Sequence, residues 1–319
     1  MPFLRPSTHA FIREGRRTPG YSLFDLLHGY VYAAWPYLYI GIGTGEHRLT
    51  QFLRPLAAWL ERRALRKLGA GDAPAALAAA EPRTFADTYH GKVVTLQSAT
   101  QLVSVKQEIS LLNLEHIVPY PVARDIILKN PDHIVALECP CRAARANPCL
   151  PLDVCLIIGE PFASFVAEHH GRRARWVAAG EASEILRDEH GRGHVHHAFF
   201  KDAMLGRFYA ICNCCACCCG AMQAQRNGVP MLASSGYVAQ MDSDRCAACG
   251  ECAAHCQFGA IRVDGAAAGS AASAHVDRVA CMGCGVCVSS CPAGAISLGR
   301  DPARPAPLEI EQLLAEALG

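Results

Sequence analysis

The stretch that decides the fold and chemistry of this chain is Cys246-Ala-Ala-Cys249-Gly-Glu-Cys252-Ala-Ala-His-Cys256, with its counterpart Cys281-Met-Gly-Cys284-Gly-Val-Cys287-Val-Ser-Ser-Cys291-Pro292. Both halves have the spacing C-x2-C-x2-C-x3-C, which is typical of thiolate sets that hold [4Fe-4S] cubanes. A pair of structural zinc sites is the main alternative. Zinc takes its ligands in pairs and has no use for three clustered cysteines plus a distant fourth. The stretch therefore predicts two cubane clusters.

On these two runs, residues from about 237 to 298 resemble the bacterial two-cluster ferredoxin family. The resemblance implies one-electron transfer at low potential, with the fourth cysteine of each run crossing to the other cluster. It implies Cys246, Cys249, Cys252 and Cys291 as ligands of cluster 1, and Cys281, Cys284, Cys287 and Cys256 as ligands of cluster 2. The first run departs from the family pattern at Gln257, where Pro often stands. That position shapes the loop and holds no ligand.

Composition narrows the function classes further. A chain of 319 residues can form two domains and a sizeable core, and its net charge of +1 gives no electrostatic case for binding nucleic acid. The 18 cysteines have the spacings of metal sites rather than of a disulfide framework. A reducing compartment suits cluster thiolates, so we expect a cytoplasmic protein. The run Gly41-Ile-Gly43-Thr-Gly45 is a poor dinucleotide fingerprint, and no flavin or NAD site is visible.

The first 69 residues read as an aromatic and basic helical arm. Residues 21–43 hold five of the nine tyrosines, and residues 48–68 combine apolar residues at helical spacing with six basic side chains. Three interpretations stay open for residues 21–68. The arm docks on the core or on a partner, lies on the inner-membrane surface as a peripheral contact, or spans the bilayer. Residues 70–83, rich in Ala, Pro and Gly, predict a linker.

Two further cysteine groups lie in residues 84–235. Cys139-x-Cys141 is followed by Cys149 and Cys155, with Arg142 and Arg145 beside them. The densest run holds six more cysteines, namely Cys212, Cys214, Cys215, Cys217, Cys218 and Cys219. Six thiolates in one loop cannot all reach one cubane, so we expect some to join the 139–155 group and the rest to build another site. One or two additional iron–sulfur clusters are favoured, with zinc or free redox-active thiols as alternatives.

His194 and His196 alternate onto one face of an expected strand, which makes them candidate metal ligands. They could equally contact a cofactor phosphate of a redox partner. The structural alternative is a pair of histidines at the edge of the core or on the surface.

The predicted fold class is α+β. We expect a cysteine-rich mixed domain over 84–235, a ferredoxin-like two-cluster module over 236–300, and a C-terminal helix over 301–319 that closes on the core. As a whole, the chain resembles a group of bacterial 4Fe-4S proteins that combine an aromatic N-terminus, a CPCR element, a CNCC-x-CCC element and a C-terminal ferredoxin module. That resemblance implies architecture and no substrate.

The favoured function is an iron–sulfur electron-transfer protein that exchanges single electrons with a reductase or dehydrogenase partner. An electron carrier or oxidoreductase subunit is thus preferred over a stand-alone enzyme. One alternative is a reductase whose substrate-binding cluster is built from cysteines 139 to 219 and fed by the ferredoxin module. A second alternative is a redox or iron sensor, or an assembly factor, with labile clusters or thiols.

Overall fold

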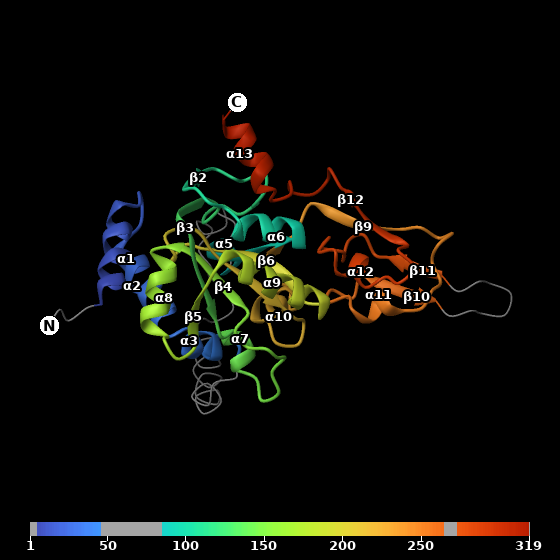
Figure 1. Cartoon of the computed structure of the whole chain (residues 1–319), viewed down its shortest axis with the longest axis horizontal. Helices are drawn as coiled ribbons and strands as arrows, with labels where there is room; N and C mark the ends of the chain where they lie inside the picture. Colours follow the sequence, from blue (N-terminus) through green and yellow to red (C-terminus); the bar gives the residue numbers. More distant parts are fainter. Residues whose placement is uncertain (1–4, 46–84, 265–272, 319) are drawn as a thin grey trace, which may run out of the picture.

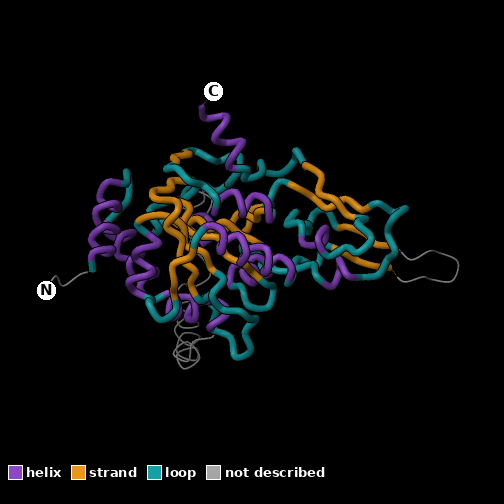
Figure 2. The backbone as a smooth tube through the Cα atoms, in the orientation of Figure 1, coloured by secondary structure: helices purple, strands orange, loops and turns teal. Residues whose placement is uncertain are grey.

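The structure, a computed structural model, describes residues 5–45, 85–264 and 273–318 (Figure 1). The predicted basic helix over 48–68 and the predicted linker over 70–83 lie outside these residues. The α+β prediction is confirmed, because helices cover both faces of a mixed sheet and a smaller module of short strands and helices lies at one end (Figures 1 and 2).

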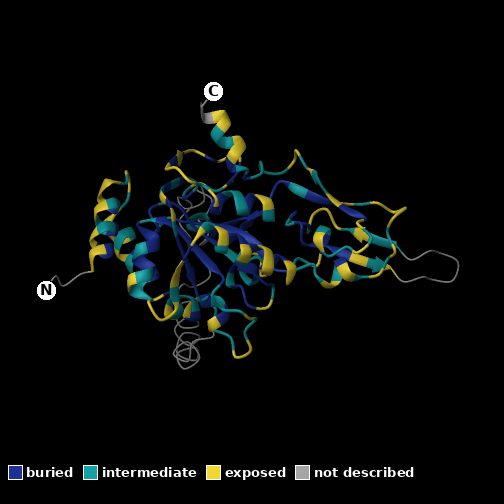
Figure 3. Ribbon diagram, viewed as in Figure 1, coloured by how far each residue is buried: buried dark blue, intermediate teal, exposed yellow. Residues whose placement is uncertain are grey.

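The central sheet has eight strands in the order β2-β3-β4-β7-β6-β1-β8, with β5 paired to β3. All of its pairings between named strands are antiparallel except β1 with β8. The strands are β1 (Tyr89–Val94), β2 (Ile109–Leu111), β3 (Ile126–Leu137), β4 (Cys155–Glu160), β5 (Ala174–Val177), β6 (Val195–Lys201), β7 (Arg207–Cys214) and β8 (Leu232–Ala233). Every residue of β6 is buried, as expected for a strand covered on both faces (Figure 3).

Helices form a layer on each side of the sheet. The side chains of α1 (Pro6–Arg17), α2 (Leu23–Ala34) and α8 (Phe162–His169) build one core with Val135, Ile157 and Phe199. On the other face, α6 (Leu96–Val103) and α9 (Ala179–Gly191) build a second core with Ile134, Leu156 and Phe208. Shorter helices are α3 (Pro36–Gly43), α5 (Phe85–Thr88), α7 (Pro140–Ala143) and α10 (Gly220–Arg226). Four cysteines of the middle domain, Cys139, Cys155, Cys214 and Cys219, belong to the first of these two cores.

The aromatic N-terminal stretch forms two helices that dock on the sheet. Ser22 and Asp25 form a capping box at the start of α2. α2 ends at Ala34, and α3 begins at Pro36, a residue suited to the first turn of a helix. Gly29 allows the close approach of α2, because a Cβ there would lie 2.0 Å from the carbonyl oxygen of Ala203. No described helix has both the length and the apolar character that crossing a membrane requires.

The C-terminal module is built from two similar halves. Its elements are β9 (Tyr237–Met241), α11 (Glu251–Ala254), β10 (Ile261–Asp264), β11 (Ser273–Val276), α12 (Val286–Ser289) and β12 (Ile296–Arg300). β9 pairs with β12, and β10 pairs with β11, both antiparallel. Each short helix follows a glycine with positive φ, Gly250 or Gly285, which ends one cysteine loop and starts the next turn. Cysteines form a large part of the module's small core.

Residues 305–309 are extended, and the last helix, α13 (Ile310–Leu318), begins only at Ile310. The extended segment closes on the core that contains α6, where Leu308 and Ile310 are buried. Lys92 of β1 donates a hydrogen bond from its Nζ to the Ala306 carbonyl at 2.8 Å. The segment thus packs beside β1, near the edge strand β8, after which the chain continues into the C-terminal module.

Candidate metal centres

All eighteen cysteines lie in the described part of the chain, and none of them forms a disulfide. The structure sorts them into four groups. Two groups of four lie in the C-terminal module, and the ten remaining cysteines divide into a group of four and a group of six. Each group is considered below against the donor set that a metal centre requires.

Two small cavities in the module are each lined by four cysteines. One is lined by Cys256, Cys281, Cys284 and Cys287. The other is lined by Cys246, Cys249, Cys252 and Cys291. In both cavities, three cysteines of one run meet the fourth cysteine of the other, which is the crossing that the ferredoxin resemblance implies. Four thiols around one cavity fit a cubane. The arrangement of the eight thiols therefore agrees with the predicted ligand sets, which remain a prediction.

Backbone amides point at the sulfur atoms of both groups. The N–H groups of Ala260 and Ala295 lie with their nitrogens 3.2 Å and 3.3 Å from the sulfur atoms of Cys256 and Cys291. Such bonds stabilise electron-rich sulfur and so raise the reduction potential of a cluster bound there. The two groups also differ in exposure, because Cys249 is exposed whereas Cys281 and Cys287 are buried.

The module packs on the central sheet through the cluster 2 cysteines. Val286 forms a small core with Val93 of β1 and Val195 of β6, and Cys284 packs against it. The side chain of Gln257, next to Cys256, accepts a hydrogen bond from the Ala216 amide at 2.8 Å and donates one to the Gly193 carbonyl at 2.9 Å. Ala216 lies within the dense cysteine run, so the loop of cluster 2 and that run are directly joined.

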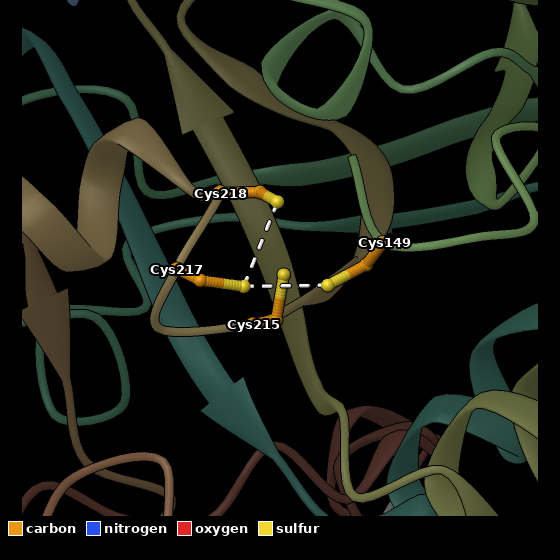
Figure 4. Close-up of side chains that lie close together, drawn as sticks. All are labelled: Cys149, Cys215, Cys217 and Cys218. Carbon is orange, nitrogen blue, oxygen red and sulfur yellow. Dashed lines mark hydrogen bonds between the residues drawn. The ribbon is translucent and has the colours of Figure 1, made fainter. Parts of the chain in front are cut away.

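The group of four outside the module consists of Cys149, Cys215, Cys217 and Cys218 (Figure 4). Their sulfur atoms all lie within 4.8 Å of one another, and Cys217 lies 3.3 Å from Cys149 and 3.6 Å from Cys218. A tetrahedral ion with metal–sulfur bonds of about 2.3 Å holds its sulfur atoms about 3.8 Å apart. This spacing therefore fits one metal ion, and a cubane would require the four side chains to spread.

Cys217 is the exposed corner of this four-cysteine group. Burial raises the pKa of its thiol, but hydrogen bonds from Cys149, Cys215 and Cys218 outweigh burial and lower that pKa below its usual value. Because the thiolate is the form that binds metal, Cys217 offers the first ligand to an ion arriving from solvent.

The group of six lies deeper, against the sheet. Its members are Cys139, Cys141, Cys155, Cys212, Cys214 and Cys219, and the strand register pairs Cys155 with Cys212. All six line one cavity, which Cys215 and Cys218 of the four-cysteine group also line. The hydrogen bond to Cys141, together with burial, raises the pKa of Cys139 to about 12, so these thiols ionise only beside a cation. Six sulfur donors around a cavity suit a thiolate-bound iron–sulfur centre and exceed the four that a cubane needs.

The division of the ten cysteines does not follow their order in the chain. Cys149 lies apart from Cys139, Cys141 and Cys155, although all four come from one stretch. In the dense run, the neighbours Cys214 and Cys215 belong to different groups, and so do Cys218 and Cys219. Cys214 ends β7, where consecutive side chains point to opposite sides, and Cys218 and Cys219 are separated where a turn leads into α10. Sequence reasoning predicted two sites here but not this membership.

Arg142 is held by an ion pair next to the six-cysteine group. Its guanidinium is almost fully buried and pairs with the buried carboxylate of Glu189. The ion pair balances much of the arginine's charge, so its electrostatic effect on a neighbouring centre is smaller than that of an unpaired guanidinium. Arg145 donates instead to the backbone carbonyl of Cys218 at 3.2 Å.

The structure brings neither His194 nor His196 to a cysteine group. His194 donates from Nδ1 to the Glu189 carboxylate at 2.7 Å. His196 donates from Nδ1 to the Asn213 side-chain oxygen at 2.6 Å, and its Nε2 lies 3.2 Å from Nδ1 of His190. Both histidines thus have protein partners that explain their burial.

His197 is the histidine that sequence reasoning missed. It is fully buried, and neither ring nitrogen has a hydrogen-bond partner among the residues that the structure describes. Burial lowers its pKa to about 3, so the ring is neutral. The available signal was strand alternation, which places His197 on the face opposite His196 and on the same side as Cys212.

The cavity of the six-cysteine group is also lined by aromatic side chains from Tyr32, Tyr89 and Tyr209. The hydroxyl groups of Tyr32 and Tyr209 form a hydrogen bond of 2.7 Å. The ammonium nitrogen of the buried Lys201 lies 4.8 Å and 5.0 Å from the ring centroids of Tyr89 and Tyr32. Phenol groups and a buried amine therefore lie beside the thiols.

The C-terminal module is the part of the chain for which the comparison with known proteins found a match. Residues 245–295 match the family model of a 4Fe-4S dicluster domain. This match supports iron–sulfur cluster binding by the module. No curated protein matches the chain significantly, and no solved structure does. The matched residues are a small part of the chain, so the resemblance of its other elements to bacterial 4Fe-4S proteins remains a prediction.

Proposed function

We propose that this chain is an iron–sulfur electron-transfer protein in which the C-terminal module exchanges electrons with the thiolate centres of the middle domain. Iron–sulfur clusters supply the one-electron chemistry when they are bound. The chain's own residues hold the centres, exclude water from them and fix the distances between them. Cys249 exposes one ligand set of the module, which is where a redox partner could approach.

The observation that carries this proposal is the joint between the module and the dense cysteine run. Gln257 follows the fourth cysteine of the first run and is bonded to Ala216, between Cys215 and Cys217. Val93, Val195 and Val286 fill the space beside Cys284. A joint of apolar packing and direct hydrogen bonds keeps ligand sets at a constant separation, as transfer between centres requires. A free-standing ferredoxin would need no such joint.

The donor sets support two further metal centres in the middle domain. The six-cysteine group suits an iron–sulfur centre, and the spacing of the four-cysteine group suits one tetrahedral ion of iron or zinc. An iron in the four-cysteine group would lie on the electron path. A zinc ion there would instead hold together the loop to which Gln257 is bonded, because zinc is not redox-active.

For the partner, we propose a reductase or dehydrogenase, with a second contact through the N-terminal helices. Leu23, Phe24 and Leu27 of α2 and Trp35 beside α3 are exposed. Exposed apolar side chains gathered on adjoining helices favour a protein or membrane-surface contact over open solvent.

One observation favours the alternative function, a reductase with substrate at the six-cysteine group. Tyr32, Tyr209 and Lys201 place proton-bearing groups beside that group, and a protein that only carries electrons has no need of them. Substrate addition to reduced protein distinguishes the two functions. A reductase reoxidises with a compound in the absence of a partner, whereas a carrier does so only with a partner protein.

The test of the proposal is the metal and sulfide content of anaerobically purified protein, with electron paramagnetic resonance after dithionite reduction. We expect iron and sulfide above the roughly eight of each that two cubanes supply. Cys284→Ala should remove one cubane of the module and leave the middle-domain metal. Cys217→Ala should remove only the ion of the four-cysteine group and leave both cubanes of the module. Protein with only about eight irons, no further metal and full electron transfer would refute the multi-centre proposal.

A further inference from the structure

His197 occupies a position in the sheet where a polar side chain is hard to explain. It lies in the middle of β6 and is fully buried. Along the same face, Val195 and Phe199 flank it, and both are apolar. Both of its ring nitrogens lack a hydrogen-bond partner in residues 5–45, 85–264 and 273–318. The other buried histidines of this region, His190, His194 and His196, all have partners.

The register of the sheet directs His197 toward the six-cysteine group. His197 is paired across the sheet with Cys212 of β7, and Val195 is paired with Cys214. Directly paired residues of antiparallel strands project to the same face, with their Cβ atoms roughly 5 Å apart. Cys212 in turn is paired with Cys155 of β4, another member of the six-cysteine group. Phe199, two residues further along the face, lines the cavity of that group.

A buried imidazole without partners is costly. Leaving a polar group unsatisfied in the interior destabilises the fold, and phenylalanine would fill a similar volume without that penalty. A neutral imidazole carries one nitrogen lone pair, which only a hydrogen-bond donor or a metal can satisfy. No described donor reaches it, while thiol groups suited to a metal begin at its cross-strand neighbour.

We propose that His197 is a nitrogen ligand of an iron centre held by the six-cysteine group. The inference rests on the proposed function, because it requires that this group binds iron. A neutral imidazole in place of an anionic thiolate leaves the centre with less negative charge. Histidine ligation raises the potential of an iron–sulfur centre for this reason. The centre then has a higher potential than the all-cysteine clusters of the module, so electrons flow from the module to it.

The test is pulsed electron paramagnetic resonance on wild-type protein in which only histidine carries ¹⁵N, poised where the higher-potential centre is paramagnetic. We expect a nitrogen coupling that changes from the ¹⁴N to the ¹⁵N pattern on labelling. It should disappear in His197→Phe and persist in His196→Gln, the matched control on the opposite face. His197→Cys should keep the iron, lose the coupling and lower the midpoint potential.

The outcomes separate this inference from the function on which it rests. Iron beyond that of the module, without any histidine nitrogen coupling, overturns the role of His197 and leaves the electron-transfer proposal intact. Iron confined to the module overturns both. Labelling of the unaltered chain shows whether any histidine is bound, and if His197→Phe fails to fold, loss of the coupling in His197→Cys assigns it to His197, whereas a coupling that persists in His197→Cys overturns the assignment.

Discussion

Lys92 shows how one buried side chain sets a pH dependence. It lies on β1 with no exposed surface and is bonded to the Ala306 carbonyl. Burial, with a smaller contribution from the charge of Arg300, lowers its pKa to about 7. The unfolded chain, where a lysine has its usual pKa of about 10.4, therefore binds a proton that the folded protein releases above neutral pH.

The sign of the effect follows directly. Between about pH 7 and pH 10 the unfolded state holds more protons than the folded state at this site, so this group makes stability rise with pH. Lys92→Met removes that contribution. We expect the variant to gain stability relative to wild type at pH 7, and we expect that advantage to shrink steadily as the pH approaches 10. Anaerobic urea unfolding at several pH values measures the difference. If the difference in unfolding free energy between the variant and wild type did not narrow as pH rises, the burial of a charged Lys92 would not explain it.

At the scale of elements, the joint between module and sheet depends on one loop. Gln257 stands where the ferredoxin pattern often has Pro, and its amide group makes the two hydrogen bonds that tie the loop to Ala216 and Gly193. Gln257 in place of Pro thus leaves the cysteine ligands unchanged and helps the module to dock on the middle domain. Gly283 allows a similarly close contact within the module, because a Cβ there would lie 2.1 Å from the Tyr237 carbonyl oxygen.

Removing the Gln257 side chain should loosen this joint. We expect Gln257→Ala to cost about 1–3 kcal/mol of stability, the value of two hydrogen bonds, and to slow electron flow from module to middle domain. Rapid-mixing reduction, followed separately at each centre, measures the rate. Gln223→Ala is the matched control, because Gln223 donates to the Cys217 carbonyl within the middle domain. Equal rates in the two variants would show that the joint does not govern transfer.

At the scale of the whole molecule, the two parts have cores of different kinds. The sheet has two apolar cores with large side chains such as Phe162, Phe200 and Phe208. The module's core is small, and cysteines, including Cys252, Cys281 and Cys287, make up much of it. Buried thiols contribute little apolar area, so we expect the module to depend on bound metal for its stability.

Iron removal should therefore unfold the module before the sheet. With an iron chelator under anaerobic conditions, we expect amide hydrogens in β9–β12 to lose protection from exchange while those of β3, β4 and β7 keep it. Hydrogen exchange read by mass spectrometry resolves the two regions. If protection were lost in both together, the module and the sheet would form one cooperative unit, and the joint would be stronger than its few contacts indicate.

The sequence by itself determined the class of the module and the eight cysteines expected to bind its clusters. Ligand spacing there is local, because three ligands of each set lie within one loop. It also predicted the α+β class and the helical N-terminal arm, since apolar periodicity and proline positions act over short distances. The division of Cys139 to Cys219 into groups of four and six was decided only by the tertiary structure. That division depends on which way each side chain points from its strand and on which strands are neighbours.

The histidines show the same limit of reasoning from sequence alone. The spacing of His194 and His196 drew attention to the face that packs on α9, where protein partners satisfy both. His197 became a candidate only when β6 was paired with β7, which set it opposite Cys212. Cross-strand register joins residues that are distant in the chain, and no local pattern encodes it. Tertiary structure alone therefore showed that the ring nitrogens of His197 have no partner among the described residues, which is the observation behind its proposed role.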